Sequence, residues 1–224
     1  MINEPVWKTL KEELEQQKVV LVAVSKTKPA SDIEQFYQLG QRDFGENYVQ
    51  ELVDKQAQLP SDIRWHFIGH LQSNKVKYIA PFVSLIHGVD SFKLLLEINK
   101  QAAKNNRTID VLLQMHIASE ASKFGMNSRD IWEFMDYYEA QQQQLQHVRI
   151  RGLMGMASFT EDENKIREEF RVLNAQFQSL RKTNFLYKDS FDTLSMGMSS
   201  DYKLAIQEGS TMVRIGSMLF GERS

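Results

Sequence analysis

Short apolar runs alternate with amphipathic segments along the whole chain. The most pronounced run, Val19–Val24, holds six consecutive apolar residues, four of them valines, which predicts a strand buried on both faces. It is followed by a serine, two lysines and Pro29, so the strand is expected to stop abruptly. Seven more short strands are predicted, at Asp43–Gly45, Arg64–Ile68, Val83–His87, Ile109–His116, Val148–Met154, Thr193–Met196 and Met212–Ile215.

Helical patterns fill most of the gaps between these strands. The segment from Ser31 to Leu39 predicts a helix with Ser31 as its N-cap and Gly40 just after its end. The run Gln141–Gln144 is predicted to lie on the solvated end of a helix, because glutamine is a fair helix former. Apolar residues at helical spacing mark three more helices, through Val6, Leu10 and Leu14; Ile131, Phe134, Met135 and Tyr138; and Ile166, Phe170, Leu173, Phe177 and Leu180.

Eight strands alternating with helices predict a parallel sheet. Eight such units in 224 residues fit a closed (β/α)8 barrel, a TIM barrel with an extra helix at its N-terminus. The alternative is an open doubly wound sheet, which would be expected to carry a glycine-rich dinucleotide fingerprint after its first strand. Ser25–Pro29 is not such a fingerprint. Because no linker rich in proline, glycine or serine divides the chain, residues 1–224 are predicted to form a single domain.

Composition narrows the functions that are open to the chain. The formal net charge of −2 gives no global positive field, which argues against nucleic acid and acidic membranes as partners. There are no cysteines, so disulfides, thiolate catalysis and cysteine-bound metals are excluded. The longest apolar run is too short to span a membrane, and the polar start Asn3–Lys8 lacks the pattern of a signal peptide. We expect a cytoplasmic protein and, since no large apolar seam is evident, a monomer.

Lys26 is the first candidate for chemistry. Working residues of a barrel lie at the carboxyl ends of its strands, and Lys26 closely follows the first strand. A lysine held in an apolar pocket loses its proton more readily, and the neutral amine can attack an aldehyde. Schiff-base chemistry is therefore the hypothesis, against the more ordinary case of a solvated lysine. Lys28 lies farther from the strand and is expected to be solvated.

The loop 194–201, after the seventh predicted strand, is at one of the two positions where such barrels usually bind phosphate. Gly197 precedes Ser199 and Ser200, either of which could cap the predicted helix Tyr202–Gln207. The free N–H groups and the positive dipole end of that helix suit a phosphate group. The alternative is a capped turn without a ligand, which is the more common use of such a sequence.

The loop 214–221, after the eighth predicted strand, is at the other position. Gly216 allows a ligand to approach the backbone closely, and Ser217 adds a hydroxyl donor. Arg214 is expected to point to the barrel mouth, where it could reach a phosphate or a ring nitrogen; alternatively, it forms an ion pair on the barrel wall. Closure of the barrel makes the first and eighth strands neighbours, which would bring this loop close to Lys26.

Four other polar residues have both a functional and an ordinary interpretation. Asn47 could hydrogen-bond the polar edge of a ligand or cap a helix from Tyr48 to Ala57. His66 and His70 invite a metal site, but their spacing lacks the glutamate of a zinc-protease helix and no third ligand is evident, so no metal is expected. Lys123 could attract an anionic ligand or be an ordinary solvated lysine.

Six segments together are typical of one protein family: Ala23–Pro29, Phe44–Glu51, Trp65–Lys75, Arg151–Met154, Leu194–Asp201 and Thr211–Gly216. In these segments the chain resembles the pyridoxal phosphate homeostasis proteins, stand-alone relatives of the N-terminal barrel of alanine racemase. The resemblance covers nearly the whole chain. Two positions depart from the family pattern, which usually has Asn where His116 stands and often Pro where Ser158 stands.

The resemblance implies that pyridoxal 5′-phosphate (PLP) forms a Schiff base on Lys26. It also implies a phosphate held by serines and Gly216 of the last two loops, with Arg214 at the pyridine nitrogen or the phosphate. The expected cofactor-binding residues are Lys26, Asn47, Ser195, Gly197, Ser199, Arg214, Gly216 and Ser217.

Two functions of different class share such a pocket. A carrier would hold PLP for vitamin B6 balance and pass it to apo-enzymes without turnover, and so without catalytic residues; the alternative is a PLP-dependent amino-acid racemase or aldolase. Racemisation needs a proton acceptor on each face of the substrate, so one lysine is insufficient. Racemases complete their site with a further domain and a second subunit, and we expect no such domain here, because the sequence reaches Ser224 soon after the eighth predicted strand. The carrier is therefore the expectation, and a scaffold that binds no cofactor is a third possibility.

Overall fold

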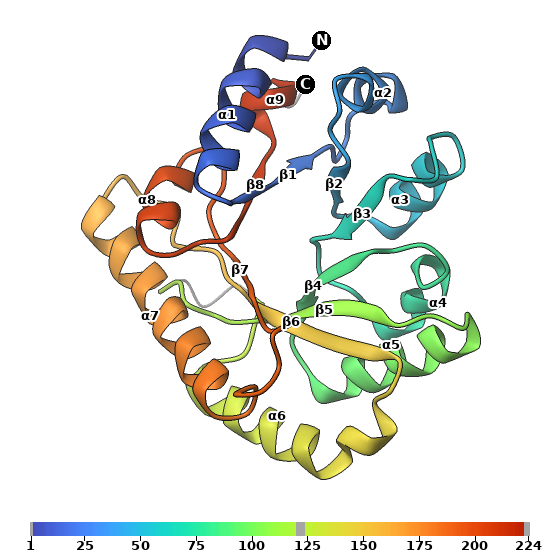
Figure 1. The fold of residues 1–224 in the computed structure, drawn as a ribbon, viewed down its shortest axis with the longest axis vertical. Coiled ribbons are helices and arrows are strands. Elements are labelled where there is room, and N and C mark those ends of the chain that lie inside the picture. The colour runs from blue at the N-terminus through green and yellow to red at the C-terminus, as the bar shows by residue number, and fades with distance from the viewer. Residues whose placement is uncertain (1, 120–123, 222–224) are drawn as a thin grey trace.

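Eight parallel strands form a closed barrel in the computed structural model, which describes residues 2–119 and 124–221 (Figure 1). The strands pair in chain order, and β1 and β8 close the ring through pairs that include Val22 with Arg214. The predicted TIM barrel is confirmed. Its strands are β1 (Val20–Val24), β2 (Asp43–Glu46), β3 (Arg64–Phe67), β4 (Leu85–Val89), β5 (Ile109–Gln114), β6 (Val148–Met154), β7 (Thr193–Ser195) and β8 (Met212–Ile215).

Helices surround the barrel, as Figure 1 shows. The predicted opening helix is α1, whose Trp7 donates its indole N–H to Gln41 (3.0 Å) next to the barrel. No helix of the described residues is both long and apolar enough to cross a membrane. The helices are α1 (Glu4–Gln16), α2 (Ala30–Gln38), α3 (Val49–Gln56), α4 (Val76–Ile79), α5 (Phe92–Lys104), α6 (Ser128–Gln141), α7 (Glu163–Lys182), α8 (Tyr202–Gln207) and α9 (Ser217–Phe220), with the 3₁₀ turns η1 (Ser73–Lys75) and η2 (Gln142–Gln144).

Several predicted boundaries differ from the structure by one or two residues; β5, for example, ends at Gln114 and not at His116. For two elements the reason is identifiable. Strand β4 runs two residues later than predicted, because Gly88 lets the strand continue against the neighbouring loop; a Cβ there would lie 2.7 Å from the carbonyl oxygen of Gly69. Ser31 does not cap α2, since Pro29 occupies the N-cap position and its φ of −68° starts the helix earlier. Gly40 ends this helix as predicted, with a φ of +102°.

Both faces of the barrel sheet are buried, as the apolar run of β1 predicts. Leu21 and Ala23 face the surrounding helices and belong to the large core between sheet and helices. Val22 points into the barrel, where it packs in a small apolar cluster with residues such as Leu112 and Met154. The rest of the interior is polar, and this polar part reaches the mouth at the carboxyl ends of the strands.

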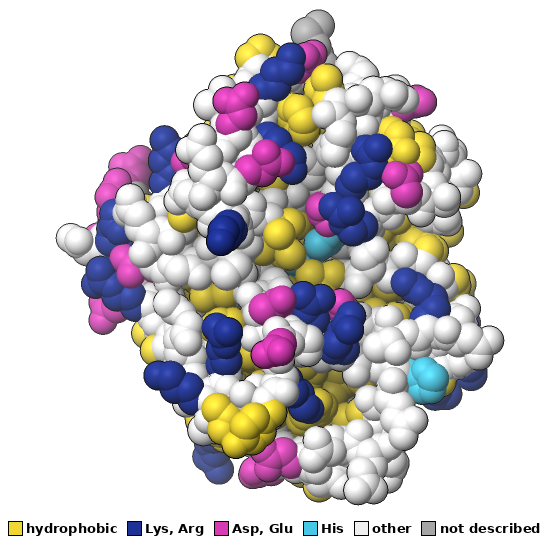
Figure 2. Space-filling model, in the orientation of Figure 1, with side chains coloured by type: hydrophobic (Ala, Val, Ile, Leu, Met, Phe, Trp, Pro, Cys, Tyr) yellow, Lys and Arg dark blue, Asp and Glu magenta, His cyan; other side chains and the backbone are white. Residues whose placement is uncertain are grey.

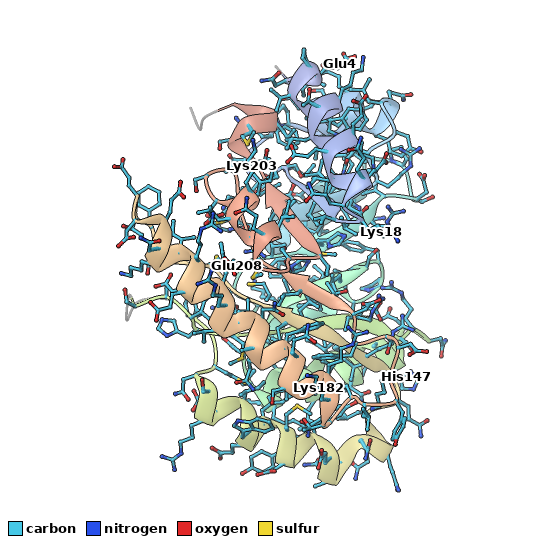
Figure 3. All side chains as sticks on the ribbon, turned by 60° about the vertical axis from the view of Figure 1, so that its left-hand side comes forward. Glu4, Lys18, His147, Lys182, Lys203 and Glu208 are labelled. Atoms are coloured by element: carbon cyan, nitrogen blue, oxygen red, sulfur yellow. The ribbon has the colours of Figure 1, made fainter. Side chains whose placement is uncertain are left out.

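Ion pairs between neighbouring strands lie at the amino end of the barrel. Arg64 pairs with Asp43 (2.5 Å) and Arg151 with Asp110 (2.9 Å). Figure 2 shows this end, where basic and acidic side chains interleave around a central hollow. Lys18, two residues before β1, marks the same end in Figure 3. The opposite end is therefore the one to which the predicted site residues belong.

Candidate functional site

A cavity of about 580 Å³ opens at the carboxyl end of the barrel, next to the ends of β1, β2 and β3 and the loops after β6, β7 and β8. Ser195 is fully buried in the barrel interior and Gly197 packs against α8, so the structure places neither on the described cavity wall. The other six predicted cofactor-binding residues line the cavity together: Lys26, Asn47, Ser199, Arg214, Gly216 and Ser217.

Lys26 lies in a tight turn after β1, which we call the lysine turn (residues 25–28). Thr27 has a φ of +63°, a left-handed conformation that β-branched residues rarely adopt. The chain therefore reverses within the turn, and both Lys26 and Lys28 are half-buried in the cavity wall. Lys28 was expected to lie away from the site, but the turn brings it to the same cavity as Lys26.

Three charged side chains of β2 and α3 form a clamp on the lysine turn. Ser25 donates its hydroxyl proton to Glu46 Oε1 (2.6 Å), while its carbonyl oxygen accepts a proton from Lys55 Nζ (2.8 Å). Two residues later, the backbone N–H of Thr27 donates to Glu51 Oε1 (2.6 Å). Lys55 lies 2.7 Å from both carboxylates and joins the two halves of the clamp. The backbone is thus fixed on either side of the candidate nucleophile.

The charges of the clamp are buried. The Glu46 side chain is 0% exposed and that of Lys55 is 7% exposed. Burial raises the pKa of Glu46 to about 7, and the Lys55 ammonium opposes this rise. No sequence-based prediction included the clamp. Its signal was a pair of opposite charges at i and i+4, Glu51 and Lys55, shortly after a glutamate in a buried strand.

Arg214 is held in the barrel mouth by uncharged oxygen atoms. Its Nη1 donates to the carbonyl oxygen (2.9 Å) and the hydroxyl (2.6 Å) of Ser195, and Nη2 donates to the carbonyl oxygen of Gly155 (3.0 Å). Burial lowers the pKa of Arg214 to about 10, with Asp201 acting in the opposite direction, so the side chain is still cationic at neutral pH. Because these acceptors are uncharged, the positive charge can act on an anionic ligand in the cavity.

The two predicted phosphate loops meet in the structure, where the backbone N–H of Gly216 donates to Ser199 Oγ (3.2 Å). The predicted serine cap of α8 is wrong. Asp201 holds the N-cap position, and its carboxylate accepts the backbone N–H three residues earlier (2.6 Å). Ser217 is the first residue of α9, a one-turn helix that was not predicted. The hydroxyl-bearing residues Ser199, Ser200 and Ser217 therefore line the cavity from these two loops.

Gly197 shapes the loop after β7 from outside the cavity. Its φ is +96°, and a Cβ on it would lie 2.6 Å from the Cβ of Ala205 in α8. Only glycine combines this left-handed conformation with so close an approach of the helix. Gly197 therefore places Ser199 through the course of the backbone.

Asn47 does not cap α3, because Tyr48 occupies the N-cap position. Its side-chain Oδ1 is buried and has no hydrogen-bond partner among the described residues. The loop after β3 presses closely on this residue, since a Cβ on Gly69 would lie 2.3 Å from the Asn47 carbonyl oxygen. A buried polar atom without a partner is costly, and a polar group of a bound ligand would satisfy it.

The two histidines of the third unit lie in different surroundings. His66 is inside the barrel, with Nε2 2.9 Å from Asp43 Oδ1 and Nδ1 3.0 Å from His87 Nε2. His70 stacks on Phe124, with 4.1 Å between ring centroids. Across residues 2–119 and 124–221, no group of three or more His, Cys, Asp or Glu side chains could hold a metal ion.

The two departures from the family pattern lie after β5 and β6. Ser158 is buried, and both its N–H and its hydroxyl donate to Glu169 of α7 (2.6 Å each). Proline has no N–H and could not make the first of these bonds. His116 is half-buried, and its N–H donates to the carbonyl oxygen of Met126 (2.9 Å). Lys123 lies outside the described residues.

A closed parallel barrel with a lysine after its first strand and an arginine on its last strand, both at one mouth, defines a barrel of the alanine racemase N-terminal type. The family model described as "Alanine racemase, N-terminal domain" matches residues 6–224. Two pyridoxal phosphate homeostasis proteins, from Aquifex aeolicus and Pasteurella multocida, are 41% and 42% identical to this chain. The alignments cover 91% and 92% of this chain and 86% and 87% of those proteins.

A solved structure agrees with this placement. PipY of Synechococcus elongatus PCC7942, determined with PLP bound, is 36% identical and superposes with a TM-score of 0.83 over 96% of this chain and 100% of that chain. The chain belongs to the family of pyridoxal phosphate homeostasis proteins.

Proposed function

We propose that this protein binds PLP in the carboxyl-end cavity, holds it covalently on Lys26 and serves PLP homeostasis without turning over a substrate. The observation that carries the proposal is the convergence of the Lys26 amine, the Arg214 guanidinium and the loops after β7 and β8 on one cavity. The PLP-bound structure of PipY, a relative at 36% identity over the same barrel, supports the choice of cofactor.

The cavity wall fits the polar parts of PLP. Ser199 and Ser217 would hold the phosphate beside the first turn of α9. Arg214 would bring its charge to the phosphate or the pyridine nitrogen, and the partnerless amide of Asn47 would meet a polar group on the ring. Bound PLP supplies an aldehyde. The Lys26 amine would bond to the aldehyde carbon with release of one water molecule.

Borohydride reduction followed by peptide mass spectrometry tests the covalent link. The reduced wild-type protein should carry one pyridoxyl group on Lys26, and Lys26→Ala should lose it while keeping weak affinity for PLP through the loops. Lys28→Ala is the matched control, because Lys28 lies on the same wall and its variant should be labelled like the wild type. A label on Lys28 in the wild-type protein would contradict the assignment.

The chemistry of the wall favours a carrier over a racemase or aldolase. Among the described wall residues, the ionisable side chains are Lys26, Lys28 and Arg214, with no carboxylate, imidazole or phenol. A racemase needs a proton donor and acceptor on opposite faces of its substrate. Incubation with the enantiomers of alanine, serine and threonine, followed by chiral chromatography, should show no catalytic conversion. Many turnovers per protein molecule would establish the enzyme instead.

As a carrier, the protein would act in the cytoplasm as a monomer and pass PLP to apo-enzymes. Phe159, 92% exposed on the wall, indicates that the cavity is open to solvent and thus to exchange. Holo-protein should activate an apo-enzyme faster than free PLP does. The free PLP in this comparison is supplied at the concentration that the holo-protein releases spontaneously without an apo-enzyme. Light scattering after size exclusion should give a mass near the 26.0 kDa of one chain.

A further inference from the structure

A chain of hydrogen bonds crosses the interior of the barrel from its amino end to the carboxyl-end cavity. Asp43 Oδ1 lies 2.9 Å from His66 Nε2, and His66 Nδ1 lies 3.0 Å from His87 Nε2. His87 Nδ1 lies 3.1 Å from Ser195 Oγ, which is 2.6 Å from Arg214 Nη1. Five side chains from β2, β3, β4, β7 and β8 are thus connected in a single line.

The line joins two cavities through a buried interior. Asp43 and His66 line a cavity of about 380 Å³ at the amino end, the hollow seen in Figure 2. Arg214 lines the proposed PLP cavity at the other end. Between them, His87 and Ser195 are both 0% exposed. Buried polar groups of this kind must be hydrogen-bonded to one another, so their donors and acceptors have to match along the whole line.

The two ends of the line fix its direction. A guanidinium can only donate, and Asp43 can only accept, because hydrogen bonds from Arg64 and His66 outweigh the opposing effect of burial and lower the pKa of Asp43 to about 2. Ser195 must then donate to His87 Nδ1. Each histidine in turn donates from Nε2 and accepts at Nδ1, so that every donor and acceptor in the line is used. Burial also lowers the pKa of His87 well below its usual value, which agrees with a neutral ring.

If the hydrogen bonds between His66 and Ser195 ran in the opposite direction, the hydroxyl proton of Ser195 would lack an acceptor. If His66 donated from both nitrogens, His87 would have to donate from Nδ1 to Ser195 Oγ. That oxygen already accepts a hydrogen bond from Arg214, and the hydroxyl proton of Ser195 would then have no acceptor in the line. The geometry therefore selects one arrangement of protons out of the several that two histidines could adopt.

We propose that Asp43, His66, His87 and Ser195 form a polarised hydrogen-bond line that positions Arg214 at the ligand cavity. Ser195 is the final member, and its hydroxyl and carbonyl oxygens together hold Nη1, which sets the plane of the guanidinium. These four residues act through Arg214 and do not contact the ligand. The effect on PLP rests on the proposed function, whereas the proton arrangement is a property of the protein alone.

Nitrogen-15 NMR of the ring nitrogens tests the proton arrangement in protein free of PLP. His66 and His87 should both be neutral and protonated on Nε2. Ser195→Ala removes the donor to His87 Nδ1 and should change the ring shifts of His87, while Ser195→Thr keeps a hydroxyl and should restore them. A proton on Nδ1 of either ring in the wild-type protein, or a doubly protonated His87, would overturn the proposal.

Binding measurements test whether the line acts through Arg214. Ser195→Ala should weaken PLP affinity about tenfold, the scale of one charge-assisted hydrogen bond, and Ser195→Thr should restore it. In an Arg214→Lys background, Ser195→Ala should add less than about threefold, because the two changes remove the same interaction. Ser210→Ala is the control, since Ser210 is also buried and its hydroxyl donates to backbone oxygens of β7 and its loop (2.7 Å to Met196 O).

The outcomes separate the two proposals. Unchanged affinity in Ser195→Ala, or full additivity with Arg214→Lys, would overturn the positioning role even if the NMR result is as expected. Absence of PLP binding to the wild-type protein would refute the proposed function and leave the NMR result to decide the proton arrangement.

Discussion

Arg214 differs from the arginines at the amino end of the barrel in the charge of its hydrogen-bond acceptors. Arg64 and Arg149 donate to aspartate carboxylates, which neutralise them locally. Arg214 donates to two carbonyl oxygens and one hydroxyl. Its two Nη atoms donate to different elements, Nη1 to Ser195 of β7 and Nη2 to Gly155 after β6. A lysine has a single ammonium group and could not make both contacts in this geometry. One side chain thus combines fixed geometry with a charge that a ligand can still use.

Asp43 should make the stability of the protein fall in acid. Its folded pKa is about 2, against an ordinary value of 3.8, so its contribution is complete above about pH 4 and is lost as the pH falls towards 2. The shift corresponds to about 2 kcal/mol of unfolding free energy. Urea unfolding of wild-type and Asp43→Asn protein between pH 2 and about pH 5 measures it. The difference between the two proteins should shrink as the pH falls, and a constant difference would contradict the assignment.

Single residues were predictable where the chain position alone determined the environment. Lys26 follows a strand of continuous apolar residues, and Arg214 lies within one, so both were expected at the barrel mouth, and both line the cavity. Ser195 is adjacent to the mouth as well, but its side chain faces inward to His87. That direction depends on the strand register, which a strand of three residues does not reveal in sequence.

At the scale of elements, the clamp of β2 and α3 controls the lysine turn. Glu51→Ala should lower the unfolding free energy by about 1–3 kcal/mol, because the Thr27 N–H and Lys55 each lose a charged acceptor. It should also slow covalent attachment of PLP about tenfold, read from the absorbance change on mixing. The control is Asp54→Ala on the same helix, because Asp54 is exposed and its carboxylate accepts a hydrogen bond from the Gln50 side chain (2.9 Å). Equal rates in the two variants would show that the clamp does not serve Lys26.

Alanine substitutions at two glycines of similar φ should distinguish the cost of backbone strain from the cost of steric crowding. Gly40 and Gly197 have φ values of +102° and +96°, but a Cβ on Gly40 would meet nothing within 4 Å, whereas one on Gly197 would press on Ala205. Gly40→Ala should cost about 1 kcal/mol, from the left-handed conformation alone. Gly197→Ala should cost at least about 1 kcal/mol more, because α8 must move. Equal losses in urea unfolding would mean that the helix shifts freely.

The existence of elements was easier to predict than their ends. β6, β8 and α8 have the predicted limits, since turn residues bracket them in the sequence. Strand β4 and helix α2 differ, because their limits depend on close backbone approach at Gly88 and on the φ of Pro29. The one-turn helix α9 has too few residues to show a helical period.

At the scale of the whole molecule, closure of the barrel should make unfolding cooperative. Trp7 and Trp65, on α1 and β3, are buried in one continuous core, whereas Trp132 on α6 is 42% exposed. Tryptophan fluorescence and far-ultraviolet circular dichroism should therefore report the same urea midpoint, as the predicted single domain requires. Two separate midpoints would show that part of the barrel unfolds independently.

The overall topology could be predicted because alternation of eight strands and helices leaves few parallel architectures. The line of hydrogen bonds inside the barrel could not, since it joins residues such as His66 and Ser195 that are far apart in sequence. Neither histidine lies in a local motif that indicates its neighbours. They come within hydrogen-bond distance only because the barrel is closed and its strands pair in this register.

The seam between β1 and β8 joins the first and the last strand of the barrel to be synthesised on the ribosome. Lys26 comes from the first barrel unit and Arg214 from the last, yet both border the same cavity. A nascent chain therefore has no complete binding site until its final strand is in place. Once PLP is bound, it would act as a clasp across this seam, and amide hydrogen exchange in β1 and β8 should slow more than in β4 and β5.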